Sequence, residues 1–304
     1  MRKPSFLLQL GWRVECLAFD AFSFVDRLLP IEWMSAFGGW VLKALGPLTG
    51  THKIAERNLR IAFPEMSAGE RERLLKLQWE NLGRLVGEFP QVDRLTPARG
   101  RVEVVGGEHL AAIAASGKPV VLISGHFANW EVMAAVIMHY GVNCNVTYRA
   151  ANNPYIDRRI IEARESYGVK LFAPKGGDGS REILEGFKQG QSVAILNDQK
   201  FNQGLAVPFF GQPAHTAPGA TRLALKVGTY LQPMSVQRLP GARFRVTIHE
   251  PIVPEKTGDK SRDIEAGVRR VSAFIEDRVR EHPEDWFWVH KRWPNEVYKA
   301  LEAR

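Results

Sequence analysis

Residues 120–131 read Val-Val-Leu-Ile-Ser-Gly-His-Phe-Ala-Asn-Trp-Glu, and they indicate the class of fold. The first four residues form a continuous apolar run rich in β-branched side chains, which is typical of a strand buried on both faces of a sheet. Further candidate strands lie at 102–105, 145–148, 169–172, 192–196, 231–237 and 244–249. Candidate helices lie at 67–89, 108–116, 130–140, 154–167, 180–189 and 262–282, the first of them opened by a capping box of Ser67 and Glu70. This alternation predicts an α/β fold with a mixed, mostly parallel sheet flanked by helices.

The residues after this strand carry the main chemical signal. His126 and Glu131 are five residues apart, so on one continuous helix their side chains would point about 140° away from each other. A turn would bring them together: Gly125 follows the strand, and Asn129 is a good N-cap that would place Glu131 in the first helical turn. We therefore expect His126, at the carboxyl end of a strand, to act as a general base that Glu131 orients. The alternative is structural, a hydrogen-bonded loop histidine and a helix-capping glutamate.

The composition is that of an ordinary globular chain with a basic balance. At 304 residues, with 45% hydrophobic and 24% charged residues, the chain suits one large domain or one domain with a substantial extension. The formal net charge of +8 favours acidic partners: an anionic membrane surface, a phosphorylated lipid, an acidic carrier protein or nucleic acid. The two cysteines show no metal-ligand spacing, so neither a disulfide framework nor a metal site is expected.

Residues 1–50 differ from the rest of the chain. They are basic at the start and rich in aromatic residues, while Arg13, Glu15 and Asp20 interrupt the apolar run. These charges, and the lack of a small-residue cleavage site, argue against a signal peptide and against a membrane-spanning helix. We expect a pair of helices lying in the membrane interface, followed by the α/β domain at 51–304. The alternative is an ordinary buried helical hairpin.

Nearly the whole chain resembles one known family. The stretch 124–131 looks like the His-x4-Asp/Glu motif of the glycerolipid acyltransferases, and more specifically of the late lauroyl and myristoyl acyltransferases of lipid A biosynthesis. Several other blocks resemble this family in the same order: Arg57-Asn58-Leu59 with Phe63-Pro64, and the blocks at 107–110, 148–158, 197–199, 207–211 and 288–293. The chain departs from the pattern at Asn197, where the family more often has Pro before the Asp-Gln pair. Collinear blocks are more specific than the motif alone, and they favour the catalytic interpretation of His126 and Glu131.

The resemblance implies a reaction and a location. It implies transfer of a fatty acyl chain from an acyl carrier protein thioester to a hydroxyl of a lipid A precursor, on the cytoplasmic face of a bacterial inner membrane. The thioester would be a co-substrate, and no further cofactor is expected. One alternative is acylation of a lysophospholipid or another glycolipid with acyl-CoA as donor. Another is a catalytically silent membrane-binding protein on the same fold, although the presence of both His126 and Glu131 argues against it.

Several polar residues are candidates for binding substrate. Arg149 ends a predicted strand beside the site, and the resemblance makes it the best-placed of three arginines whose planar fork suits phosphate oxygens; the others are Arg158 and Arg181. The alternative for each arginine is an ordinary surface ion pair. Asp198 follows the predicted strand 192–196, so it should either orient His126 or contact substrate. Asn129, within the motif, completes this group of candidates.

Two further stretches are expected to be structural. The Gly-rich stretch 175–179 lacks the Gly-Lys-Ser/Thr ending of a nucleotide-binding loop, so we interpret it as a turn. The mixture of basic and aromatic residues at 286–293 could suggest nucleic acid, but no recognised nucleic-acid-binding fold accompanies it. We expect this tail to pack against the core.

Overall fold

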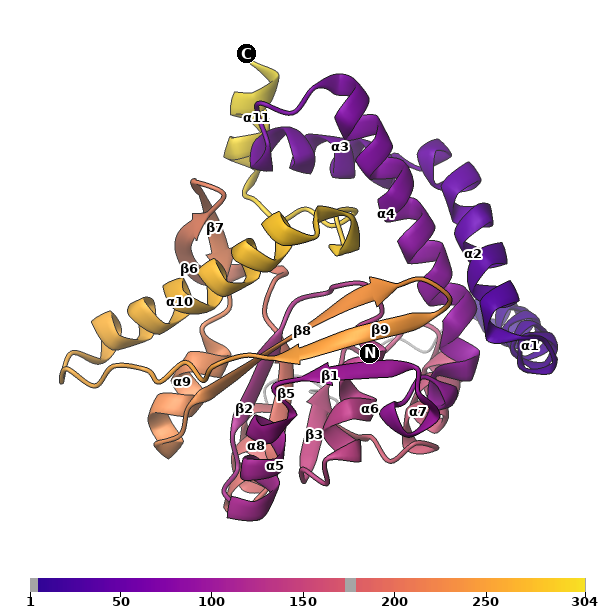
Figure 1. Ribbon diagram of the computed structural model, residues 1–304. Helices are drawn as coiled ribbons and strands as arrows, with labels where there is room; N and C mark the ends of the chain where they lie inside the picture. Colours follow the sequence, from indigo (N-terminus) through magenta and orange to yellow (C-terminus); the bar gives the residue numbers. More distant parts are fainter. Residues whose placement is uncertain (1–4, 173–178, 304) are drawn as a thin grey trace.

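A mixed sheet forms the centre of the molecule (Figure 1). The computed structural model describes residues 5–172 and 179–303, with the backbone alone at 171–172 and 179–181. The sheet contains β1 (Val102–Val105), β2 (Val121–Ser124), β3 (Cys144–Thr147), β4 (Lys170–Phe172), β5 (Ser192–Leu196), β8 (Leu231–Leu239) and β9 (Arg243–Ile248). In the described residues their order is β1-β9-β8-β2-β5-β3-β4. Among the described pairings of this sheet only β8–β9 is antiparallel, so the predicted mixed, mostly parallel sheet is confirmed.

The predicted central strand lies in the middle of this sheet. β2 pairs in parallel with β5 on one side and with β8 on the other. Val121, Leu122 and Ile123 are at most 1% exposed, as expected for a strand covered on both faces. The carboxyl end of β2 therefore opens next to the carboxyl end of β5, where parallel sheets commonly bind ligands.

Helices cover the sheet on both faces (Figure 1). They are α5 (Gly107–Ser116), α6 (Glu131–His139), α7 (Pro154–Glu165), α8 (Gly179–Lys188), α9 (Gly219–Val227) and α10 (Lys260–Glu281). The predicted left-handed cap of α5 is confirmed, because Gly117 has a φ of 62°. Helix α9 was not predicted from the sequence, and neither was a hairpin of β6 (Lys200–Phe209) and β7 (Gln212–Thr216). β6 lacks clean alternation and contains a register shift between Lys200 and Leu205, which explains why its pattern was weak.

A second group of helices adjoins the sheet. α3 (Gly50–Ala62) and α11 (Asn295–Glu302) contact each other, and α4 (Ala68–Glu88) runs between α2 and the sheet (Figure 1). The predicted capping box opens α4: the Ser67 hydroxyl accepts the Glu70 N–H, and the Glu70 carboxylate accepts the Ser67 N–H at 2.9 Å. The tail behaves as predicted, because Trp286, Trp288 and Trp293 are at most 3% exposed and belong to the main core.

The two N-terminal helices, α1 (Phe6–Leu28) and α2 (Ile31–Leu45), combine both alternatives considered for this segment. α2 packs closely on α4, and a Cβ added at Gly83 would lie 2.1 Å from the carbonyl oxygen of Gly38. Yet large apolar side chains on both helices face outward, among them Phe6, Trp33 and Trp40 at 79%, 66% and 67% exposed. Within the described ranges no helix is both long enough and apolar enough to span a bilayer. The division of the chain into domains at residue 50 stays a prediction.

Candidate active site

His126 lies just beyond the carboxyl end of β2, beside Asp198 beyond the end of β5. Ser124 and Leu196 are paired in the parallel β2–β5 ladder, so the residues two places further along each chain emerge side by side. The Nδ1 atom of His126 lies 2.6 Å from Oδ1 of Asp198. The other carboxylate oxygen, Oδ2, accepts the backbone N–H of His126 at 2.7 Å and the indole N–H of Trp286 at 2.8 Å. These bonds fix both the carboxylate and the ring that it contacts.

The electrostatics of this pair suit a general base. Burial alone would raise the pKa of Asp198, but the His126 ring and the hydrogen bonds to the carboxylate lower it to about 2. Burial alone would also favour a neutral imidazole, but the Asp198 carboxylate outweighs it and raises the pKa of His126. With Nδ1–H donated to Asp198, the lone pair of Nε2 is left to accept a proton. The amide nitrogen of Gln199 lies 3.4 Å from Nε2.

Glu131 is not the partner of His126, which corrects the sequence-based expectation. Glu131 is the first residue of α6, and its two carboxylate oxygens accept Nε and a terminal nitrogen of Arg164 at 2.9 and 2.6 Å. The side chain of Glu131 is buried and that of Arg164 is partly buried, and the Arg164 guanidinium also lies 5.7 Å from the centre of the Tyr148 ring. The start of α6 directs Glu131 toward α7, whereas the strand register directs His126 toward β5. Within the described residues Glu131 makes no hydrogen bond to His126, but its charge helps to raise the pKa of the imidazole.

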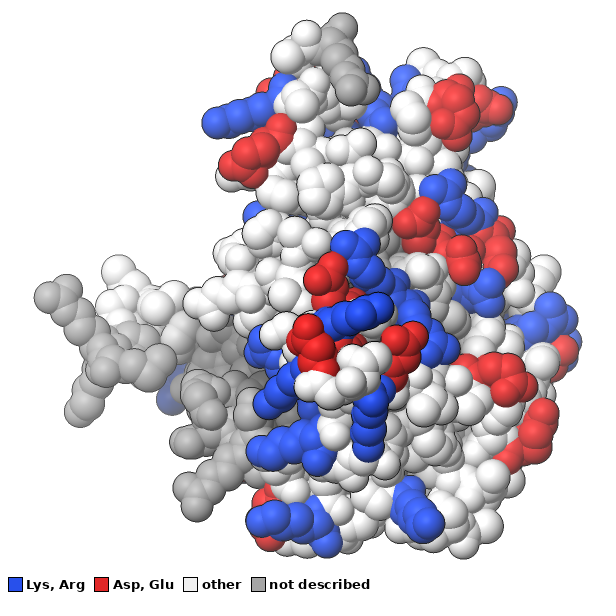
Figure 2. All heavy atoms as spheres, turned by 90° about the vertical axis from the view of Figure 1, so that its left-hand side faces the viewer, with Lys and Arg blue, Asp and Glu red and all other residues white. Residues whose placement is uncertain are grey.

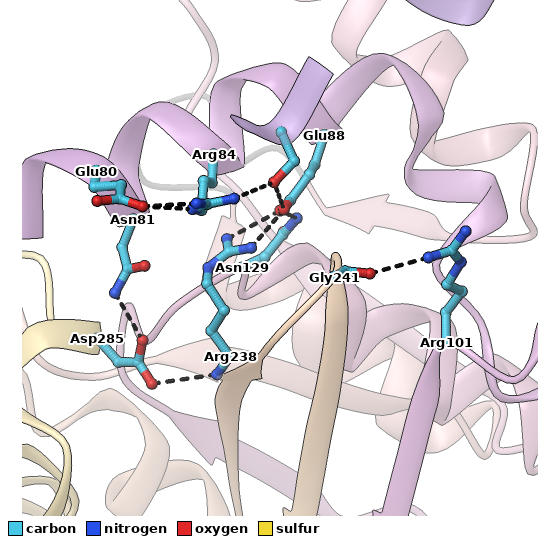
Figure 3. A network of polar contacts seen from close by, with 10 residues as sticks. Glu80, Asn81, Arg84, Glu88, Arg101, Asn129, Arg238, Gly241 and Asp285 are labelled. Atoms are coloured by element: carbon cyan, nitrogen blue, oxygen red, sulfur yellow. Dashed lines mark hydrogen bonds and ion pairs between the residues drawn. The ribbon is translucent and has the colours of Figure 1, made fainter. Parts of the chain in front are cut away.

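Asn129 is also placed differently from the expectation. The N-cap of α6 is Trp130, and the buried Asn129 side chain turns away to donate to Oε2 of Glu88 at 2.9 Å (Figure 3). Glu88 in turn accepts the Ser35 hydroxyl at 2.7 Å and forms a buried ion pair with Arg238. Asn129 therefore anchors the loop from behind through its amide nitrogen, and its part in substrate binding stays a prediction.

The loop that carries His126 is held by further contacts around Asp285. Ala128 has a φ of +43°, a left-handed conformation that is uncommon for alanine, and its N–H donates to the carbonyl of Asp285 at 2.7 Å. The Asp285 carboxylate accepts the Asn81 amide at 3.0 Å and the backbone N–H of Arg238 at 3.2 Å (Figure 3). Burial raises the pKa of Asp285 to about 7. These contacts, from α4, β8 and the turn before Trp286, hold the strained loop in one conformation.

The three arginine candidates have different surroundings. Arg149 lies just past β3, is exposed, and makes no ion pair or hydrogen bond within the described residues. Because β3 pairs with β5, Arg149 lies at the same edge of the sheet as Asp198, as expected. Arg158 is 79% exposed and pairs with Glu162 at 3.4 Å, which is the surface ion pair considered as its alternative. The side chain of Arg181 and most of the Gly-rich stretch 175–179 lie outside the described residues.

A small cavity opens beside His126, and most of its walls were missed from the sequence. Trp130 and Phe287 place their ring centres 5.0 and 6.0 Å from that of His126 and form its apolar wall. Gln78, Asn81 and Leu82, spaced to share one face of α4, also line the cavity. Arg164 and Trp286 were missed as well. A pattern in sequence could have placed Trp286 in the core, but nothing in it pairs a tryptophan with an aspartate 88 residues away.

Comparison with known proteins agrees with this geometry. Residues 5–295 match the family described as bacterial lipid A biosynthesis acyltransferase. The chain belongs to this family. Among its relatives, the lipid A biosynthesis lauroyltransferase of Escherichia coli K12 is 27% identical over 79% of this chain and 78% of its own length. A lipid A biosynthesis acyltransferase of Haemophilus influenzae is 25% identical over 77% of this chain and 73% of its own.

Another relative, whose name gives a different lipid as the acyl acceptor, is about as similar to this chain as the lipid A enzymes are. The phosphatidylinositol mannoside acyltransferase of Mycobacterium tuberculosis H37Rv is 25% identical over 82% of this chain and 79% of its own length. The family membership therefore shows an acyltransferase of lipid A or a related lipid. At such identities, family membership does not identify the acceptor lipid.

Proposed function

We propose that this acyltransferase moves a fatty acyl chain from an acyl carrier protein thioester to a hydroxyl of a lipid A precursor, with His126 as general base. The observation that carries the proposal is the His126–Asp198 pair at the carboxyl ends of β2 and β5, where His126 also lines a cavity. The membership of a lipid A acyltransferase family supports the acceptor class.

The proposed chemistry needs only this pair and the two substrates. Asp198 holds the Nδ1–H tautomer, and Nε2 of His126 takes the proton of the acceptor hydroxyl as that oxygen attacks the thioester carbonyl. The tetrahedral intermediate then collapses, the carbon–sulfur bond breaks, and the departing thiolate takes the proton from the imidazolium. Asp198 stabilises that imidazolium, in the direction shown by the raised pKa of His126. General base catalysis of this kind contributes about 10²–10⁴-fold.

Glu131 and Arg164 have a supporting part in this proposal. Their two-bond ion pair ties the start of α6 to the end of α7, and so holds Trp130, which precedes α6 and lines the cavity. Removing either partner would leave the other charge unpaired inside the protein, and this would lower the stability of the fold. Arg149, which has no protein partner in the described part of the chain, is the arginine left to hold a substrate phosphate.

The N-terminal helices are proposed to lie on the cytoplasmic face of the inner membrane. The two helices expose large apolar side chains from Phe6 to Leu45, and exposed apolar surface of this kind is typical of a membrane-binding segment. This face is joined to the site: Arg159 of α7 donates to both oxygens of Asp20 on α1 at 2.8 and 2.9 Å, and Asn153 donates to Glu15 at 2.9 Å. A lipid acceptor lying in the membrane would then be close to the cavity lined by α4.

The experiment is in vitro acylation, with the product read by mass. Acyl carrier protein thioester and acyl-CoA are each offered with a lipid A precursor and with a phosphatidylinositol mannoside, using the full chain and His126→Ala. We expect mass gain on the lipid A precursor from the carrier thioester, lost in His126→Ala. Preferential acylation of the mannoside, or preference for acyl-CoA, would replace this proposal with the alternative that the mycobacterial relative supports. No turnover of any thioester would favour the catalytically silent alternative.

A further inference from the structure

A polar cavity of about 220 Å³ lies beside the β8–β9 hairpin. In the described pairings β8 accompanies β2 as far as Pro233, and it then continues to Leu239 with β9 as its partner. Residues directly opposite each other on antiparallel strands share a face, and so do residues two apart on one strand. Polar side chains of the hairpin therefore share one face and line the cavity: Ser235, Gln237, Arg245 and Thr247. Convergent polar groups around a hollow of this size are typical of a ligand site.

The end of α10 and the loop that carries His126 complete the cavity. Arg278 and His282 line it from the last turn of α10 and its C-cap. Phe127, which follows His126, and Asp285, whose carbonyl holds the loop, line it as well. The cavity therefore adjoins the proposed active site, on the side of β2 where β8 lies.

The side chains at this cavity offer hydrogen-bond donors that the protein does not use. Burial and the charge of Arg278 lower the pKa of His249 to about 4, so this ring is neutral. Arg278 donates to its Nδ1 at 3.3 Å, and its Nε2–H therefore donates to the Ser235 hydroxyl at 2.8 Å, which leaves that hydroxyl free to donate. The Thr247 hydroxyl makes no hydrogen bond within the described residues, and Nε of Arg278 is buried without a partner.

The acidic groups at the cavity are already engaged. The Glu281 carboxylate, which is 52% exposed, pairs with Arg278, and the Asp285 carboxylate accepts N–H groups from α4 and β8. Arg245 pairs with Glu103 at 3.0 Å, but one carboxylate contact does not fill the five N–H donors of a guanidinium. Free donors therefore outnumber free acceptors here, and this excess suits a ligand that mainly accepts hydrogen bonds, an oxyanion.

We propose that this cavity binds a phosphate group, held by the Arg278 guanidinium and by the hydroxyls of Ser235 and Thr247. The oxygens of a phosphate point in several directions, so they suit donors that converge from two strands and a helix. The two oxygens of a carboxylate lie in one plane and suit this arrangement less well. Arg149 follows β3, and β5 and β2 lie between β3 and β8 in the sheet, so Arg149 would hold a different phosphate.

Two sources have this chemistry: a phosphate on the headgroup of the acceptor lipid, and free phosphate. The first source would place the headgroup beside the loop that carries His126. That assignment rests on the proposed function, whereas the phosphate site itself does not.

The first test is calorimetric titration of the full chain, in detergent, with inorganic phosphate at constant ionic strength. We expect Arg278→Met to raise Kd about tenfold, because it removes a charged donor, and Thr247→Val to raise it about threefold, because it removes a neutral one. Arg280→Met is the matched control for the lost charge, and it should leave Kd unchanged. Arg280 is on the same helix, pairs with Glu276 and is not among the described residues that line the cavity.

Thr247→Val separates binding from folding. Its hydroxyl makes no hydrogen bond within the described part of the chain, so its loss should leave Tm unchanged. Arg278→Met also loses contacts with His249 and Glu281, so its Tm should fall. Equal Kd values for wild type, Thr247→Val and Arg278→Met would overturn the proposal.

Steady-state kinetics identify the source of the phosphate. A lipid A precursor is compared with the same precursor after a phosphatase has removed its phosphates, for wild type and Thr247→Val. If the headgroup is the source, Thr247→Val should raise KM about threefold for the phosphorylated precursor alone, and inorganic phosphate should compete with that precursor. If free phosphate is the ligand, the variant should change KM for neither acceptor while Kd for phosphate still rises.

Absence of phosphate binding, together with KM values that do not depend on the phosphates of the acceptor, would overturn the proposal. Failure of the proposed function is distinguishable, because the calorimetric titration requires no turnover.

Discussion

Two carboxylates act on His126, and they do so in different ways. Asp198 is buried and hydrogen-bonds to Nδ1 of the ring. Both carboxylate oxygens of Glu131 instead accept hydrogen bonds from Arg164, and its charge helps to raise the pKa of His126. A hydrogen-bonded carboxylate fixes the tautomer and stabilises the imidazolium, but a carboxylate paired with arginine does neither. In the proposed mechanism, the residue that orients the base is therefore Asp198, which follows β5.

The first prediction separates these two carboxylates. Asp198→Asn should lower kcat/KM about 10²-fold or more, and Glu131→Gln should lower it less. Asp198 raises the pKa of His126, and the base acts when it is unprotonated, so removing this charge should move the acid limb of the kcat/KM profile to lower pH. The measurement is kcat/KM from acid to neutral pH for both variants. A larger defect in Glu131→Gln than in Asp198→Asn would return the orienting role to the motif glutamate.

The second prediction concerns Trp286, whose indole N–H donates to Oδ2 of Asp198. In Trp286→Phe the carboxylate loses this bond and keeps more negative charge beside the imidazole, so His126 should hold its proton more tightly. We expect kcat/KM to fall about tenfold and its acid limb to move to higher pH. The control is Trp288→Phe, because Trp288 is equally buried but donates to the carbonyl of Pro283. An identical pH profile for the two variants would reduce Trp286 to a packing residue.

At the scale of the elements, the joint between α2 and α4 explains how the apolar N-terminus is attached. Gly38 on α2 faces Gly83 on α4, and the carbonyl of Met34 lies where Gly87 would place a Cβ, 2.2 Å away. Backbones this close leave no room for side chains, so the helices pack along their whole shared length. The hydroxyl of Ser35 on α2 donates to Glu88 at the end of α4. Glu88 also pairs with Arg238 and accepts the side-chain amide of Asn129, so the packed helices are connected to the loop that carries His126 (Figure 3).

The third prediction tests this joint. In Gly83→Ala the new methyl group would meet the Gly38 carbonyl at 2.1 Å, and overpacking of this kind costs about 1–3 kcal/mol of unfolding free energy. Gly69→Ala is the matched control on the same helix, since nothing lies within 4 Å of its Cβ position. It should be neutral or slightly stabilising, because alanine is the better helix former. Equal denaturant midpoints for the two variants would show that α2 yields easily and is not fixed to α4.

At the scale of the whole molecule, the apolar N-terminal helices and one cluster of basic residues lie on different sides. α1 and α2 are on one side, and β6, β7 and the start of α10 are on the opposite one (Figure 1). Figure 2 views the molecule from that second side, and Lys and Arg side chains gather there around a few acidic ones. Exposed basic residues of this region include Arg222, Lys226, Lys260 and Arg269. Apolar burial, and not this cluster of charge, should therefore decide membrane binding.

The fourth prediction follows from that separation. Trp33 and Trp40 are seven residues apart on α2 and two-thirds exposed, so replacing both with Ser should remove most binding to vesicles of phosphatidylethanolamine and phosphatidylglycerol. Arg222→Glu with Lys226→Glu on α9 is the control, and it should leave vesicle flotation nearly unchanged. Circular dichroism checks that each variant is folded. Loss of flotation in the α9 variant alone would assign membrane binding to the basic face.

What the sequence by itself determined is local. The apolar run at 120–123, the capping box at Ser67 and the glycine stop at Gly117 depend on neighbouring residues, and each predicted its element to within a residue or two. The position of His126 at a strand end followed in the same way. β6 and α9 were not predicted because their sequence patterns are interrupted or short.

The tertiary structure alone decided which groups meet at the site. His126 and Asp198 are 72 residues apart, and Trp286 is a further 88 residues along the chain. They come together because β2 and β5 are neighbours in parallel register and because the C-terminal tail crosses the same sheet edge. Glu131 lies close in sequence but is carried toward Arg164 by the direction in which α6 begins. Strand order and helix direction are set by packing of the whole core, so a short sequence motif cannot predict either of them.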